Sequence, residues 1–180
     1  MTSDISLFIL DIAQNSFKAG ADCISVHIKS TVKGLVFRIA DNGKGFDKEA
    51  LLRAERGEDQ HLKTGGKGLL SLYNACGGRI KIRSTKGCGS SVLASFDKSV
   101  PTGDVSQTLM SLLILSQNGV RIKFRASAGK ESFFIDTDGI KAILGDVSIL
   151  ERNVYRFLDS YVKKGLESVF EEKTHHKEEN

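Results

Sequence analysis

The chain has 180 residues, a formal net charge of +4 and a hydrophobic fraction of 40%, which fits one domain with an appendage and excludes a disordered chain. It has no apolar run of 18 residues, and its N-terminus carries acids but no early Lys or Arg, so neither a transmembrane helix nor a secretory signal is expected. Cys23, Cys76 and Cys88 lack CxxC spacing, which argues against a disulfide framework and a zinc site. These features predict a cytoplasmic protein.

A helix is predicted first, because apolar residues recur at spacings of three and four between a cap at Ser3 or Asp4 and a left-handed end at Gly20. Alternating apolar residues and turn glycines then indicate further elements. In chain order these are strands 23–29 and 35–40, a short helix 47–55, a loop 56–66, a helix 67–76, and strands 79–84 and 90–96.

The only proline, Pro101, marks a junction. Beyond it we expect a helix over 105–116, a hairpin of strands 120–126 and 132–135, and helices over 138–144 and 150–172, the last capped near Ser148. Residues 98–180 contain too few apolar residues to fold alone, so we expect them to pack on the first part. Their helices can cover the sheet, mediate homodimerisation or bind a protein partner.

Four short motifs follow one another on these elements: Asp11-Ile-Ala-Gln-Asn-Ser-Phe-Lys18 on a helix, Asp41-Asn-Gly-Lys-Gly-Phe46 after a strand, Thr64-Gly-Gly-Lys-Gly-Leu-Leu70 before a helix, and Gly87-Cys-Gly-Ser90 at the start of a strand. Each alone is weak, and Asp-Asn-Gly by itself is a hairpin turn. The ordered set is far more specific, because four independent coincidences are needed.

The set resembles the N box, G1 box, G2 box and terminal glycine motif of the GHKL superfamily. This superfamily contains gyrase B, the ninety-kilodalton heat-shock chaperones, histidine kinases, MutL proteins and anti-sigma-factor kinases. The resemblance implies an α+β, two-layer sandwich of Bergerat type, with a mixed, mostly antiparallel sheet and helices on one face. It implies a domain over 1–97 that binds ATP or ADP with Mg²⁺, followed by a hairpin-and-helix extension over 98–180.

In this family Asp41 would accept a hydrogen bond from the exocyclic amine of adenine, since an ionised carboxylate is only an acceptor. Gly43 and Gly45 would let the backbone approach the base, and Phe46 would pack in the floor of the pocket. Ser90 stands where the family usually has threonine, and its hydroxyl would complete a water-bridged contact between adenine and Asp41.

The triphosphate would lie at glycines that precede a helix, where backbone N–H groups and the helix dipole favour an anion. The residues that the resemblance assigns to this end are Thr64, Gly66, Lys67, Gly68 and Leu69. His61 and Lys63 in the preceding loop can reach phosphates on closure, or remain exposed loop residues.

Asp11, Asn15 and Lys18 share a face of the first helix, because they are separated by four and three residues. Asn15 offers a neutral carbonyl oxygen that suits Mg²⁺ already bound to phosphates. Lys18 either meets a phosphate or is simply solvated. Asp11 stands where many family members have a catalytic glutamate, and its side chain is one methylene shorter, so it either acts as the base or is only part of a polar helix face.

Two classes of function therefore remain open. One is a nucleotide-dependent regulatory module that acts on a protein partner without efficient chemistry. The other is a weak ATPase or a serine- or histidine-type protein kinase that uses Asp11 as its base. Autokinase activity in cis is not expected, because no acceptor histidine on a dimerisation hairpin precedes the first motif. The basic residues are scattered through 29–86, so a nucleic-acid partner is not indicated, nor is a membrane.

Overall fold

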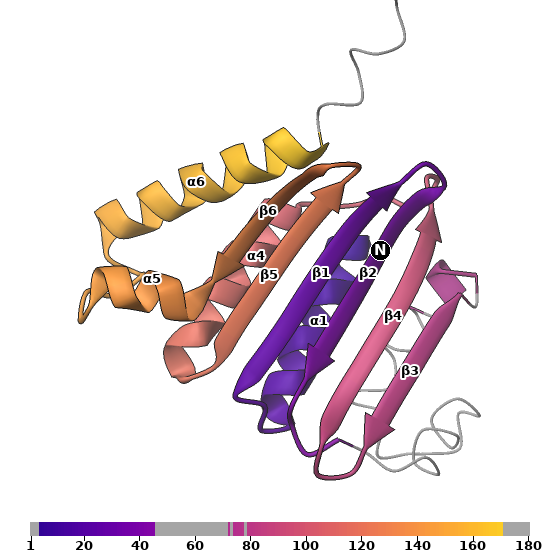
Figure 1. Cartoon of the computed structure of the whole chain (residues 1–180), viewed down its shortest axis with the longest axis horizontal. Helices are drawn as coiled ribbons and strands as arrows, with labels where there is room; N and C mark the ends of the chain where they lie inside the picture. The colour runs from indigo at the N-terminus through magenta and orange to yellow at the C-terminus, as the bar shows by residue number, and fades with distance from the viewer. Residues whose placement is uncertain (1–3, 46–71, 73, 78, 171–180) are drawn as a thin grey trace, which may run out of the picture.

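The computed structural model describes residues 4–45, 72, 74–77 and 79–170, and they form one mixed sheet with helices on one side (Figure 1). We call the described residues up to Asp97 the first segment. It contains helix α1 (Ile5–Lys18) and strands β1 (Cys23–Thr31) and β2 (Gly34–Asp41). Strands β3 (Ile80–Thr85) and β4 (Gly89–Asp97) follow. The predicted elements 47–55, 56–66 and most of 67–76 lie outside the described residues.

We call residues 98–170 the second segment. Its first element is helix α4 (Val105–Leu115), which runs into the short 3₁₀ turn η2 (Ser116–Asn118). Strands β5 (Arg121–Ala128) and β6 (Glu131–Asp136) form a hairpin, and helices α5 (Thr137–Leu144) and α6 (Arg152–Phe170) follow. All of these elements except η2 were predicted, with differences of one or two residues at their ends. For example, α6 begins at Arg152 rather than at 150, and the Glu151 carboxylate accepts a hydrogen bond from the Asn153 N–H.

The strand order is β3-β4-β2-β1-β5-β6. Only β1 and β5 run parallel, and the other four pairs are antiparallel. The mixed, mostly antiparallel α+β sheet is therefore confirmed. Because β5 pairs with β1, the sheet continues without a break from the first segment into the second. The division into units 1–97 and 98–180 stays a prediction.

The core lies between the sheet and α1, α4 and α6, because alternate residues of every strand except the edge strand β3 are buried on that side. Phe37 of β2 and Phe124 of β5 are fully buried there. The ring of Phe96 contacts both Phe8 and Phe37, with centroids 6.3 and 5.5 Å apart. No helix of the described residues is both long and apolar enough to cross a membrane.

The start of α1 is held by both segments of the chain. Asp4 caps the helix by accepting a hydrogen bond from the Leu7 N–H, as a cap residue does. The Ile5 and Ser6 N–H groups, which have no partner inside the helix, donate to the carbonyl oxygens of Pro101 and Thr102. The orientation of α1 therefore depends on the segment that leads into α4.

Helix α6 lies on the sheet at Gly165, where a side chain would not fit. A Cβ atom at Gly165 would lie 2.2 Å from the ring of Phe133, which is buried on β6. At Gly139 of α5, a Cβ atom would have nothing within 4 Å. The two helical glycines therefore form a matched pair that differs in packing.

We expect Gly165→Ala to lower the free energy of unfolding by about 1–3 kcal/mol, because overpacking outweighs the better helix propensity of alanine. Gly139→Ala should be neutral or raise it by up to about 1 kcal/mol. Urea denaturation followed by circular dichroism measures both. Equal effects would show that Phe133 does not fix the position of α6.

Candidate functional site

The Asp41 carboxylate, at the end of β2, lies where three segments of the chain meet. Its Oδ2 accepts hydrogen bonds from the hydroxyls of Ser16 on α1, at 2.8 Å, and Ser90 on β4, at 2.5 Å. Its Oδ1 accepts from the Gly43 N–H at 2.9 Å. A carboxylate has about four acceptor sites, so one remains on Oδ1. The side chain is thus fixed by donors while it keeps the capacity to accept one further hydrogen bond.

The turn after Asp41 is held against the end of α1. The Asn42 side chain accepts hydrogen bonds from the N–H groups of Asp22 and Cys23, at 3.1 and 3.0 Å, and donates to the Asp22 carboxylate at 2.5 Å. The Lys44 N–H donates to the Ala19 carbonyl oxygen at 2.9 Å. The Asp-Asn-Gly turn is therefore a rigid support for Asp41 rather than a free loop.

Glycine is required at two places where backbone segments touch. Gly45 has a φ of 57°, and a Cβ atom there would lie 2.3 Å from the Thr85 carbonyl oxygen. Gly89 has a φ of 100°, and its Cβ atom would lie 2.0 Å from the carbonyl oxygen of Asp41. The terminal glycine motif thus serves to bring the start of β4 onto the residue that carries the carboxylate.

The predicted residues on α1 lie on the helix that Ser16 joins to Asp41. Asp11 and Asn15 are half-buried and Lys18 is exposed. None of the three side chains forms a hydrogen bond or an ion pair with another described residue. Their polar atoms thus have no structural partner within the part of the chain that the structure describes.

The remaining predicted site residues lie outside the described residues, as do the loop residues His61 and Lys63. They are Phe46, Thr64, Gly66, Lys67, Gly68 and Leu69. The structure therefore brings together the predicted adenine end, at Asp41, Gly43, Gly45 and Ser90, and the helix that carries Asp11 and Asn15.

Sequence reasoning missed Ser16, whose hydroxyl shares an oxygen of Asp41 with Ser90. Ser16 is only 5% exposed. A serine at an otherwise apolar helix position was the available signal, because a buried hydroxyl needs a hydrogen-bond partner. The role of Asn42 in closing the turn on Asp22 was also missed. The Ser90 hydroxyl donates a direct hydrogen bond to Asp41, and its part in a water-bridged contact between adenine and Asp41 stays a prediction.

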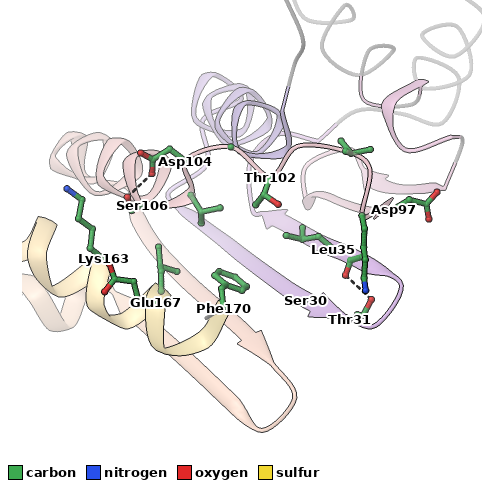
Figure 2. Close-up of a pocket in the computed structure, with 16 residues that line it drawn as sticks. Ser30, Thr31, Leu35, Asp97, Thr102, Asp104, Ser106, Lys163, Glu167 and Phe170 are labelled. Carbon is green, nitrogen blue, oxygen red and sulfur yellow. Dashed lines mark hydrogen bonds between the residues drawn. The ribbon is translucent and has the colours of Figure 1, made fainter. Parts of the chain in front are cut away.

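A cavity of about 770 Å³ lies elsewhere among the described residues. Figure 2 shows Thr31 and Leu35 from the far end of the β1–β2 hairpin together with Lys163 and Phe170 of α6. Asp97, Asp104 and Lys163 among its charged groups already have structural partners. Asp104 caps α4, and hydrogen bonds from the Gln107 N–H and the Ser106 hydroxyl hold the pKa of Asp104 below its usual range.

Lys163, on the wall of the same cavity, forms an ion pair with Asp159 one helical turn away. Both Asp104 and Lys163 are therefore engaged in structural contacts on the cavity wall. A metal site built from protein ligands is absent from the described residues, because no three His, Cys, Asp or Glu side chains cluster. A cation at Asn15 would need ligands from a bound phosphate.

Comparison with known protein families identifies the fold and the motifs together. Residues 2–100 match the family described as histidine kinase-, DNA gyrase B-, and HSP90-like ATPase. The chain belongs to this family. The resemblance of the four motifs is thereby confirmed, and ATP binding is supported at the level of the superfamily. A comparison with curated proteins gave no significant match.

Solved structures agree with the fold at low sequence identity. An N-terminal domain of a DNA repair protein has a TM-score of 0.50 and 16% identity over 93% of this chain and 56% of its own length. The MutL ATPase domain of Aquifex aeolicus complexed with ADP has a TM-score of 0.47 and 14% identity over 70% of this chain and 60% of its own length. The chain thus spans less than two thirds of either structure.

The contact between Gly89 and Asp41 can be tested against Gly87, which also has a positive φ, 78°, but has nothing within 4 Å of its Cβ position. Both alanine substitutions add backbone strain of about 1–2 kcal/mol. Gly89→Ala should lower the free energy of unfolding by about 1–3 kcal/mol more, because its Cβ atom overlaps the backbone of Asp41. Urea denaturation measures the difference, and equal losses would contradict this close approach.

Proposed function

We propose that this protein binds ATP with Mg²⁺ and works as a nucleotide-dependent regulatory module on a protein partner. The observation that carries the proposal is the Asp41 carboxylate, held by Ser16, Ser90 and the Gly43 N–H with one acceptor site left on Oδ1. The 6-amino group of adenine donates to such an acceptor, whereas the carbonyl that guanine carries at the same ring position does not. The site therefore suits adenine rather than guanine.

The fixed geometry of Asp41 also supports binding. A carboxylate already oriented by three donors loses little conformational freedom when a ligand arrives. Glycine at position 43 also leaves the space beside Oδ1 of Asp41 open, because a Cβ atom there would lie 3.2 Å from Oδ1 and 3.0 Å from the Ala19 carbonyl oxygen. A base can therefore approach the remaining acceptor site without meeting a side chain at Gly43.

Asn15 and Lys18 extend the proposed site along α1. Bound ATP would present phosphate oxygens, and Mg²⁺ would take the amide oxygen of Asn15 together with those phosphates and water. Mg²⁺ neutralises phosphate charge when it is bound. In the proposal Lys18 and the glycines 66 and 68 meet the phosphates.

The regulatory part of the proposal is supported by the contacts of α1 with the second segment. The Ile5 and Ser6 N–H groups donate to Pro101 and Thr102, and the Thr108 hydroxyl of α4 donates to the Ser6 carbonyl oxygen at 3.3 Å. A shift of α1 on nucleotide binding would therefore be transmitted to α4. A partner on the second segment would in turn change nucleotide affinity, because coupling between two sites is reciprocal.

The adenine site is tested by Asp41→Asn, with Asp146→Asn as a control on an exposed loop residue. An asparagine presents donors as well as an acceptor, so at least one of the four contacts at this position is lost. We expect ATP affinity to fall at least tenfold, a loss of about 1.4 kcal/mol, while the control keeps wild-type affinity. Calorimetric titration with ATP, ADP and GTP measures it. Unchanged affinity in Asp41→Asn would contradict the site.

An active ATPase or protein kinase is the alternative, and Asp11 is the observation that favours it. The Asp11 carboxylate is half-buried on α1 and is not used by another described residue. It is therefore free to act as a general base, directly or through a water.

Phosphate release from ATP by the wild type and by Asp11→Ala separates the two functions. For the regulatory module we expect equal background rates with intact ATP binding. A rate that falls by about 10²–10⁴-fold in Asp11→Ala would assign catalysis to this residue instead. Transfer of labelled phosphate to a co-purified protein would identify a kinase.

A further inference from the structure

The face of the sheet opposite α1 and α4 is turned toward the viewer in Figure 1, and no helix of the described residues crosses it. Its residues alternate with the buried residues of each strand, so they are read directly from the strand register. One row across the sheet contains Lys81, Leu93, Arg38, His27, Arg125 and Phe134, in the order of the strands.

A second row lies two residues along the strands and contains Arg83, Ser91, Ala40, Ser25, Lys123 and the acidic Asp136. Lys29 on β1 lies two residues from the first row in the other direction, opposite Val36 and Ser127. We call the six basic residues of these rows the basic face. They are Lys29, Arg38, Lys81, Arg83, Lys123 and Arg125.

Acids among the described residues offset the basic face only in part. Asp136 on β6 lies opposite Lys123, and its pKa is lowered first by the hydrogen bond from Arg121 and also by the charge of Lys123. Two carboxylates share this side of the sheet, and each forms an ion pair with an arginine outside the six. Asp97 pairs with Arg79 at 2.8 Å, and Asp136 pairs with Arg121 at 2.5 Å. None of the six basic residues forms an ion pair with a described residue, and five of the six are exposed.

His27, in the middle of the first row, is affected by the positive charge of the basic face. Its pKa lies below the usual value, because burial and then the charges of Arg125, Lys29 and Arg38 oppose its protonation. The groups that face it from the neighbouring strands are Arg38, Arg125 and the Ser127 hydroxyl, which lies 3.1 Å from Nε2, and Lys29 lies two residues away on its own strand. No carboxylate among the described residues offsets the effect of these cations on His27.

The spacing of the cations suits an extended polyanion. Strands lie about 4.8 Å apart, so Lys81, Arg38 and Arg125, on every second strand, follow one another at about 10 Å across the sheet. Between the cations lie small hydroxyl side chains such as Ser25, Ser91 and Ser127, which leave room for a backbone and can donate hydrogen bonds. Three of the six are arginines, whose planar forks bind phosphate oxygens in pairs.

We propose that the basic face binds nucleic acid through its phosphate backbone. A strand of nucleic acid supplies closely and regularly spaced charge along its whole length, and this suits a wide surface on which cations outnumber acids. A patch of carboxylates on a folded protein does not extend in this way. A second copy of this chain is disfavoured as the occupant, since two such faces repel. The cations meet phosphates rather than base edges, so binding depends strongly on salt and weakly on sequence.

This surface is separate from the proposed nucleotide site. Asp41 points to the helix side of the sheet, because its carboxylate bonds to Ser16 of α1. Binding at the basic face is therefore expected to be independent of ATP binding. Variants on the basic face should keep the ATP affinity of the wild type.

The test is fluorescence anisotropy of the full chain with a labelled 20-nucleotide single strand and a duplex of the same length, at a series of KCl concentrations. The test variant is Arg38→Gln/Arg125→Gln, and the control is Arg156→Gln/Lys164→Gln, which removes the same charge from exposed positions on α6. We expect at least tenfold weaker binding at 50 mM KCl in the test variant only. For the duplex, the slope of log Kd against log salt should fall by about 2.

Two further measurements test the same proposal independently of the first variant. Lys81→Gln/Arg83→Gln on β3 should weaken binding in the same way if the first variant does not fold, as checked by its thermal melt. Histidine NMR should show the pKa of His27 rising when the oligonucleotide is added, because phosphates offset the neighbouring cations. Equal weakening in the α6 control, an unchanged His27 pKa with bound oligonucleotide, or binding of polyglutamate in preference to both oligonucleotides would overturn the proposal.

Discussion

Helices cover the sheet of this protein on one side, and this one-sided burial decides where both proposed binding surfaces lie. Alternate side chains of every strand point to opposite faces, so a residue on the helix side is followed by one on the open side. On the helix side, the ends of β2 and β4 bring Asp41 and Ser90 to Ser16 of α1. A register shift of one residue would move Asp41 to the open face and destroy this arrangement.

The Asp41 carboxylate shows how a polar group can be held without losing its function. Hydrogen bonds from α1, β4 and its own turn fix both oxygens, and they use three of about four acceptor sites. Burial of a polar group is tolerable when such partners are present. The same bonds join the helix that carries Asp11 and Asn15 to the sheet, so the adenine end and the proposed phosphate end of the site are mechanically connected.

Residues 98–170 contribute directly to the sheet and to the position of α1. Strand β5 pairs with β1 in parallel, and the Pro101 and Thr102 carbonyl oxygens accept the first N–H groups of α1. The second segment also supplies Lys123 and Arg125 to the basic face. It therefore bears on both proposed surfaces, although its own sequence contains no recognised motif.

The sequence by itself determined the family, the order of the elements and the Asp41 motif, because periodicity, capping and glycine spacing are local properties of the chain. It could not reveal that Ser16 bonds to Asp41, since the two residues are joined only when α1 packs on the end of β2. Nor could it gather the scattered basic residues into one surface. Lys81, Arg38 and Arg125 are far apart in the chain, and only the pairing of non-adjacent strands places them in one row across the open sheet.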